Sequence, residues 1–178
     1  MIIQLMNLQT KRLLLVPLGP QYLISTHKYA SDFENTKYMV HLPNIDSSET
    51  NSFLEKVHAE WQKHNPQFYE YAILLDNEHI GAISIYINKD NAEGELGWIV
   101  SKNYWGNGFA TEAAREVINF ALQELKVSRF IAHCDGENIC SYRVMEKLGM
   151  TLAEKTRGRR NKLSDEDREE LMYSLEIK

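Results

Sequence analysis

The segment VSKNYWGNGFATE, residues 100–112, decides how the surrounding chain folds. The residues before it form a β-rich run, and Thr111 to Leu125 carry apolar side chains at helical spacing. The segment therefore predicts a strand that leads through a glycine loop into a long helix. The first N–H groups of a helix have no partners within it, and together with the helix dipole they favour an anion such as a pyrophosphate. Gly106 and Gly108 would let the loop backbone approach such a group closely.

Two other phosphate-binding loops can be excluded at this point. A dinucleotide fingerprint needs glycine at position 111, where Thr111 stands, and a P-loop needs Gly-Lys-Ser/Thr, which is absent. Two glycines one residue apart also occur in plain tight turns. The loop alone therefore indicates an anion site without naming the ligand.

The first half of the chain predicts one strand, two helices and a three-stranded meander. Pro17 and Pro20 stop the first strand. This strand and the two helices are expected over Arg12–Leu18, over Gln21–Asp32, and from a Ser47 or Ser48 cap to Asn65. The meander strands are expected over Phe68–Leu75, His79–Ile87 and Glu95–Ser101.

The second half predicts alternating helices and strands. After the long helix, strands are expected over Ser128–Cys134, Met150–Lys155 and Glu170–Ile177, and a helix is expected over Asn138–Leu148. This order favours an α/β fold with a mixed, mostly antiparallel central sheet and helices on both faces. The length of 178 residues predicts a single domain, 1–178.

Composition excludes several classes of function. A formal net charge of −5 argues against binding nucleic acid through unspecific phosphate contacts. The one basic stretch, 155–162, is followed at once by acidic residues, which predicts a hairpin with charge pairs across its strands. Cys134 and Cys140 are too few for a disulfide framework and lack the spacing of a zinc site, so we expect reduced thiols and no metal. No apolar run approaches the ~18 residues that span a bilayer, and no signal peptide is evident, so we expect a cytoplasmic protein without a membrane partner.

Two motifs together resemble a known family. Trp105 to Ala110, WGNGFA, resembles the acetyl-CoA loop Q/R-x-x-G-x-G/A of the GNAT acetyltransferases. Trp105 departs from the usual Gln or Arg, as in the RimJ/RimL-like branch, whose loops often read Tyr-Trp-Gly-x-Gly-Tyr/Phe-Ala-Thr-Glu-Ala. Downstream, NICSYRVMEKLGM from Asn138 is similar to the family's N-x-x-S/A-x-x-v-x-e-k-l-G-F. The resemblance runs from about Tyr71 to Leu152 and weakens at both ends.

The resemblance implies an N-acetyltransferase that uses acetyl-CoA as donor and no metal. It places the pantetheine arm beside the strand end and at Asn138, and the pyrophosphate on the loop N–H groups with the Thr111 hydroxyl. The implied cofactor-binding residues are Ile99, Val100, Trp105, Gly106, Asn107, Gly108, Phe109, Ala110, Thr111, Asn138 and Ser141. Asn138 is also a good helix N-cap, and both roles can hold together.

The reaction needs a base, because an α-amine of pKa about 7.7–8.0 or a lysine of about 10.4 is largely protonated at neutral pH. Glu95 is the candidate, since it opens the predicted strand before the loop and the family often has a glutamate there. Glu93 is expected in the preceding turn. The alternative is that either carboxylate is merely solvated.

The departing thiolate benefits from a proton donor, for which many GNAT enzymes use a tyrosine seven residues after the motif asparagine. That position is Met145, so this assignment fails here and Ser141 becomes the candidate. Its alternative role is to cap the helix that begins after Asn138. Cys140 has no residue beside it in sequence that would activate it, so an acyl-cysteine route is not expected.

The acceptor is less well defined by sequence. The resemblance favours a primary amine, first a peptide or ribosomal-protein N-terminus, then small amines, and relatives of this kind often form homodimers. A catalytically silent domain that binds acyl-CoA as a sensor is the alternative, and it would keep the loop and lose the base. A nucleic-acid-binding module is disfavoured by charge.

Overall fold

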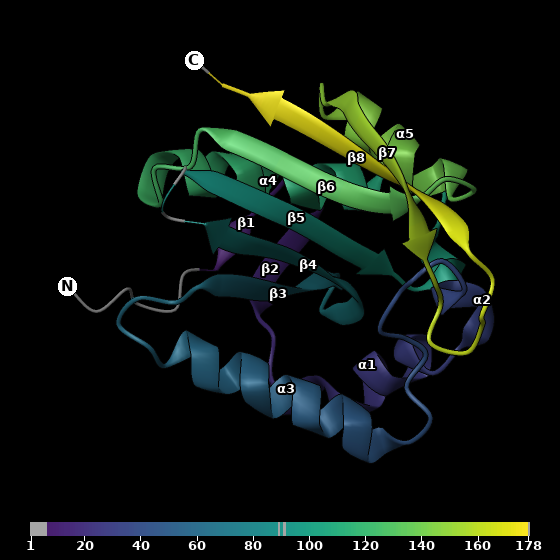
Figure 1. The fold of residues 1–178 in the computed structure, drawn as a ribbon. Helices are drawn as coiled ribbons and strands as arrows, with labels where there is room; N and C mark the ends of the chain where they lie inside the picture. Colours follow the sequence, from purple (N-terminus) through teal and green to yellow (C-terminus); the bar gives the residue numbers. More distant parts are fainter. Residues whose placement is uncertain (1–6, 89, 91, 178) are drawn as a thin grey trace.

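The computed structural model describes residues 7–88, 90 and 92–177. In this part of the chain one sheet has the strand order β1-β2-β3-β4-β5-β6-β8-β7 (Figure 1). The strands are β1 Leu8–Gln9, β2 Leu13–Pro17, β3 Phe68–Leu75, β4 Glu78–Asn88, β5 Glu93–Val100, β6 Arg129–Asp135, β7 Thr151–Arg159 and β8 Arg168–Glu176. The helices are η1 Pro20–Tyr22, α1 Leu23–Ala30, α2 Phe33–Thr36, α3 Ser47–Trp61, η2 Lys102–Tyr104, α4 Phe109–Glu124 and α5 Ile139–Lys147, where η marks a 3-10 turn.

Helices cover both faces of the sheet, which confirms the predicted mixed α/β fold. Figure 1 shows α4 and α5 behind the sheet and α1 and α3 below it. The apolar stripe of α4 forms the larger core, where Ala114, Val117 and Ala121 are fully buried. On the opposite face Leu54 and Val57 of α3 pack against β3 and β4 in a second, smaller core.

Several local expectations were wrong at element ends. The α3 cap is Asp46, whose carboxylate accepts the N–H groups of Ser48 and Glu49, rather than Ser47 or Ser48. Aspartate has the same capping chemistry as serine, so adjacent candidates could not be separated by type. Glu93 is the first residue of β5 rather than part of the turn, so Glu95 is the third residue of that strand.

Other elements were missed or misplaced. Strand β1 and helix α2 were not expected, since each is too short to show a period. The predicted Gln21–Asp32 helix is divided between η1 and α1. Helix α4 begins two residues before Thr111, at Phe109. No helix in the described residues is long and apolar enough to cross a membrane.

Strands β5 and β6 form the one parallel pair in the described sheet, and they are paired over only part of their length. Pairing runs from Glu93 with Arg129 to Leu96 with Ala132 and then ends. Strand β5 nevertheless continues to Val100, and β6 continues while paired with β8. The two strands therefore diverge beyond the Leu96–Ala132 pair, toward the ends that lead into α4 and α5.

The predicted charged hairpin is confirmed in β7 and β8. Lys155 pairs with Glu169 and Arg157 with Asp167, each at 3.6 Å, and Arg159 pairs with Glu170. These basic side chains are thus neutralised within the hairpin or by its neighbours.

A buried carboxyl group lies on the α1–α3 face of the sheet. Glu70 of β3 is 7% exposed, and the Tyr86 hydroxyl donates a hydrogen bond of 3.1 Å to its Oε1. Among the described residues no basic side chain is paired with it. Burial raises the pKa of Glu70 from 4.5 to about 7, and the Tyr86 hydrogen bond offsets part of that rise.

We expect Glu70→Gln to raise the melting temperature above neutral pH and to change it little in acid. Below pH 4.5 the carboxyl is protonated in both the folded and the unfolded state, so its burial carries no ionisation penalty. Between pH 4.5 and about 7 the unfolded state is ionised and the folded state is not, so the folded state loses up to about 3 kcal/mol of stability over this range, and the loss is complete above about pH 7. Thermal denaturation in acid and in alkali measures the difference, with the exposed Glu55→Gln as control. An equal shift at both pH values would contradict this account.

Candidate active site

The glycine loop joins β5 to α4 in a conformation that leaves the start of the helix open. Gly108 is the N-cap of α4 at φ +78°, in the left-handed region, and no side chain caps the helix. Gly106 has the same φ, and a Cβ placed there would meet nothing within 4 Å. The first turn of a 16-residue helix therefore presents its N–H groups outward. This is the local geometry that an anion site requires.

The loop is held by hydrogen bonds from its own side chains. The Trp105 indole N–H donates to the Val100 carbonyl at 2.7 Å, and the Asn107 side-chain amide donates to the carbonyls of Tyr104 and Trp105 at 3.0 Å each. Trp105 thus ties the loop back to the end of β5. Asn107 closes the turn from inside.

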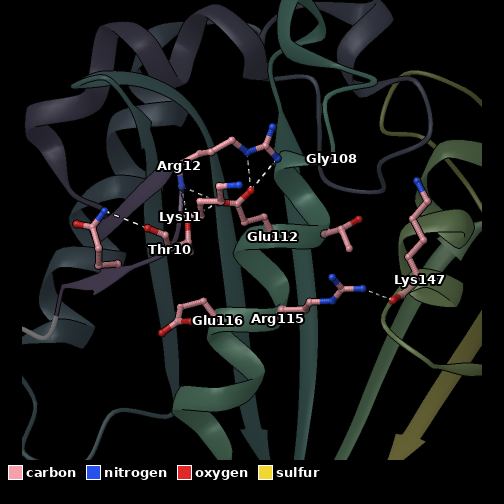
Figure 2. A pocket seen from close by; sticks show the side chains of 10 residues that line it. Thr10, Lys11, Arg12, Gly108, Glu112, Arg115, Glu116 and Lys147 are labelled. Carbon is pink, nitrogen blue, oxygen red and sulfur yellow. Dashed lines mark hydrogen bonds and ion pairs between the residues drawn. The ribbon is translucent and has the colours of Figure 1, made fainter.

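Arg12, from the turn between β1 and β2, also holds the loop in place, and Figure 2 shows its side chain near Gly108. The Arg12 guanidinium donates through Nη2 to the Asn107 carbonyl at 3.0 Å and through Nε to Glu112 at 2.7 Å. Glu112 also accepts the Thr10 hydroxyl at 2.6 Å. The contact holds the Asn107 carbonyl toward Arg12, which directs the following Gly108 N–H away from it. Sequence reasoning missed this clamp, because its members are 95 or more positions apart.

A hollow of about 600 Å³ lies beside the loop, between α4 and the β1–β2 turn (Figure 2). Four basic residues line it with Gly108 and Thr111, namely Lys11, Arg12, Arg115 and Lys147. Arg115 donates to the Lys147 carbonyl at 2.8 Å and so links α4 to α5. Two glutamates also line the hollow, and one of them, Glu112, is neutralised by Arg12. Open helical N–H groups next to basic side chains fit the diphosphate of a coenzyme A molecule.

The diverging edge of β5 carries the predicted residues Ile99 and Val100. The Val100 carbonyl already accepts the Trp105 indole and, at 3.3 Å, the Asn35 side-chain amide. Ile99 packs against the smaller core on the α1–α3 face. An extended ligand arm along this edge would therefore meet the backbone groups of β5 that the loop leaves free.

The second motif begins where β6 ends. Asn138 is the N-cap of α5, and its side chain accepts the backbone N–H of Ser141 at 3.2 Å. The cap therefore uses the Ser141 backbone rather than its hydroxyl. The hydroxyl is instead close enough to the Cys134 thiol to influence its pKa, which burial raises to about 11. Both cysteines are free, and a thiol with so high a pKa is a poor nucleophile at neutral pH.

Glu95 is paired with a histidine that the sequence did not single out. Its Oε1 lies 2.9 Å from Nδ1 of His133 on β6. The hydrogen bond to Glu95 raises the pKa of His133, and burial opposes that rise. Glu93 is engaged separately, with Arg129 at 2.9 Å. Because only the sheet register brings positions 95 and 133 together, no local pattern could have shown the pair.

The two predicted catalytic residues lie on opposite faces of the sheet. Leu96 and Cys134 belong to the core under α4 and α5. Side chains alternate along a strand, so Glu95 and His133 face the α1–α3 side. Ser141 lies at Cys134, on the α4–α5 side. The diverging ends of β5 and β6 lie between them, which would allow two reactants to approach from the two faces.

The chain is similar to known proteins in both sequence and structure. Residues 12–151 match the family model described as acetyltransferase (GNAT) domain. The uncharacterized N-acetyltransferase YnaD of Bacillus subtilis is 32% identical over 148 residues, 82% of each chain. A GNAT-family acetyltransferase structure from Bacillus anthracis is 26% identical with a TM-score of 0.80, covering 96% of this chain and 98% of that one. The ribosomal alpha-N-protein acetyltransferase RimL in complex with coenzyme A has a TM-score of 0.84 at 17% identity, covering 97% and 98%. The RimL likeness concerns the fold alone.

Proposed function

The chain belongs to the GNAT acetyltransferase family, and from this premise we propose that it transfers the acetyl group of acetyl-CoA to a primary amine within a ternary complex. The observation that carries the proposal is the uncapped start of α4 beside the diverging ends of β5 and β6. The open helix end suits the diphosphate, and the diverging strands suit the pantetheine arm.

In this proposal the predicted residues of the loop and of the strand ends have distinct roles in binding the donor. The backbone from Gly106 to Ala110, with the Thr111 hydroxyl, would hold the diphosphate. Trp105 and Asn107 keep the loop in shape, and Phe109, under the Arg12 guanidinium at 4.5 Å, anchors the start of the helix. Ile99 and Val100 would flank the pantetheine arm on one side and Asn138 on the other.

Proton transfer would involve groups on both faces. On the α1–α3 face the carboxylate of Glu95 helps to remove a proton from the attacking amine. On the α4–α5 face the Ser141 hydroxyl donates a proton to the departing thiolate. The separation of the two groups by the sheet matches a direct transfer, in which amine and thioester meet between the strands.

We expect Ser141→Ala to lower the rate of acetyl transfer by roughly 10²-fold, the low end of the effect of a positioned acid. Donor affinity should stay within a few-fold. Because the α5 cap uses the Ser141 backbone N–H, the melting temperature should not change. Steady-state rates and thermal denaturation test this, with Cys140→Ala, an exposed neighbour, as control. A loss of stability with normal turnover would give the Ser141 hydroxyl a structural role and remove it from the reaction.

We place the chain in the RimJ/RimL-like branch and propose a protein or peptide N-terminal α-amine as the first acceptor class, with small amines second. The Tyr104–Ala113 loop sequence supports the branch, and the likeness to RimL supports its fold. The acceptor class is tested by incubating the protein and acetyl-CoA with N-terminal peptides and with small amines. Mass spectrometry then identifies which substrate has gained one acetyl group, and acetylation of small amines alone would exclude the peptide class.

A further inference from the structure

The Glu95–His133 pair occupies a particular place in the sheet register. Glu95 pairs with Ile131 inside the closed part of β5 and β6. His133 is the first β6 residue beyond the last pair, Leu96 with Ala132. His133 therefore lies on the part of β6 that has separated from β5, whereas Glu95 lies on the part of β5 that is still paired with β6.

The two side chains also differ in their exposure and hydrogen bonding. The Glu95 carboxylate is half exposed and turns one oxygen toward the imidazole, 2.9 Å from Nδ1. The imidazole is 27% exposed, and among the described residues its Nε2 has no hydrogen-bond partner. A histidine that donates Nδ1–H to a carboxylate presents the lone pair of Nε2 on the other side of the ring.

We propose that His133 is the catalytic base of the acetyl transfer and that Glu95 is a positioning residue that fixes the imidazole tautomer. The inference deepens the proposed function and rests on it. It assigns the proton acceptor to Nε2 of His133, at the opening between the strands. Glu95 then acts as the carboxylate does in other carboxylate–histidine pairs, by orienting the ring and stabilising its cationic form.

The chemistry balances with these two residues. Nε2 accepts a proton from the amine nitrogen as that nitrogen bonds to the acetyl carbon. The carbon–sulfur bond breaks, and the sulfur takes the electron pair and a proton supplied through Ser141. His133 afterwards releases its proton to water, and Ser141 is reprotonated from water. An amine that arrives as its ammonium form first releases one proton to water, because attack needs the nitrogen lone pair. The net products are then the acetylated amine, the free thiol and one proton.

Three charged groups on neighbouring strands act on His133. Glu95 on β5 raises its pKa most, Glu170 on β8 raises it further, and Arg159 on β7 lowers it. Arg159 and Glu170 are paired with each other, so their effects partly cancel. Removing the Glu95 charge should therefore lower the pKa of His133, whereas Glu93 is held by Arg129 and is not among these groups.

The first test measures the imidazole itself, without any substrate. Nuclear magnetic resonance of nitrogen-15-labelled histidine follows the six histidines through a pH titration, and His133→Gln assigns the resonance. We expect the neutral ring to carry its proton on Nδ1, and Glu95→Gln to lower the His133 pKa while the other five are unchanged. A neutral ring protonated on Nε2, or a His133 pKa that does not respond to Glu95→Gln, would overturn the assignment of roles.

The second test compares the pH dependence of kcat/KM with that titration, using one acceptor amine throughout. His133→Gln should lower kcat/KM by roughly 10²- to 10⁴-fold, as expected for loss of a positioned base. In the wild type the acidic limb of the profile should follow the measured His133 pKa, and in Glu95→Gln both should move to lower pH together. Wild-type kcat/KM in His133→Gln would overturn the inference while leaving the proposed function intact. A wild-type protein inactive on every amine would instead reject the proposed function, and the base role with it.

Discussion

Gly108→Val is expected to reduce the affinity for coenzyme A by roughly 100-fold or more, which corresponds to at least about 2.7 kcal/mol of binding free energy. Gly108 has φ +78°, which a β-branched residue strongly disfavours, so the loop peptide must turn and carry its N–H groups out of position. The new side chain would also stand where the diphosphate approaches. Isothermal titration calorimetry with coenzyme A measures the loss.

The control must separate backbone strain from loss of the binding site. Gly158 in the β7–β8 hairpin also has a positive φ, +98°, and a Cβ there meets nothing within 4 Å. Gly158→Val should therefore carry similar strain and retain normal affinity. Unchanged affinity in a folded Gly108→Val protein would remove the loop from the binding site.

Glu95→Gln is expected to lower kcat/KM by roughly 10²- to 10⁴-fold at neutral pH, because the substitution keeps the size of the side chain and removes the charge that supports proton transfer. The deficit should persist at high pH, because the imidazole of His133 is already neutral there and the acidic limb of the variant lies at lower pH than that of the wild type. Initial rates across the pH range measure both effects. Glu93→Gln, on the same strand and face but paired with Arg129, is the matched control and should stay near wild type.

A different outcome would give Glu95 a different role. If the carboxylate only binds a cationic acceptor, the variant should show a raised acceptor KM and a nearly unchanged kcat. The lost interaction would then have stabilised the ground state and the transition state equally. Wild-type kcat/KM at neutral pH would remove Glu95 from the reaction.

The parts of the fold that sequence predicted are those with a local signal. The helical period of α4 and the alternating strands of the meander were correctly expected because each residue pattern is complete within its own segment. The predicted start of a helix was wrong where neighbouring residues can cap it equally well, as Asp46 and the two serines after it can for α3. Trp105 departed from the broad family pattern, and its hydrogen bond to Val100 gives that departure a structural role.

The candidate site was less predictable, because its partners meet across the sheet. Asn138 and Ser141 lie in one motif, so their capping relation was expected, although not that it would use the serine backbone. Arg12 reaches the loop from the turn between β1 and β2, and His133 reaches Glu95 from the neighbouring parallel strand. Nothing near either residue in sequence marks it, since register and topology alone create the contact.

The central claim is that this chain moves an acetyl group from acetyl-CoA to an amine, and release of free thiol tests it most directly. The protein is mixed with acetyl-CoA, with and without each member of a panel of peptides and amines, and thiol is measured over time. We predict thiol release that requires an amine, saturates with it and equals the amount of acetylated product. Binding of acetyl-CoA with no amine-dependent thiol release from any member of the panel would contradict the claim and favour a silent acyl-CoA-binding domain.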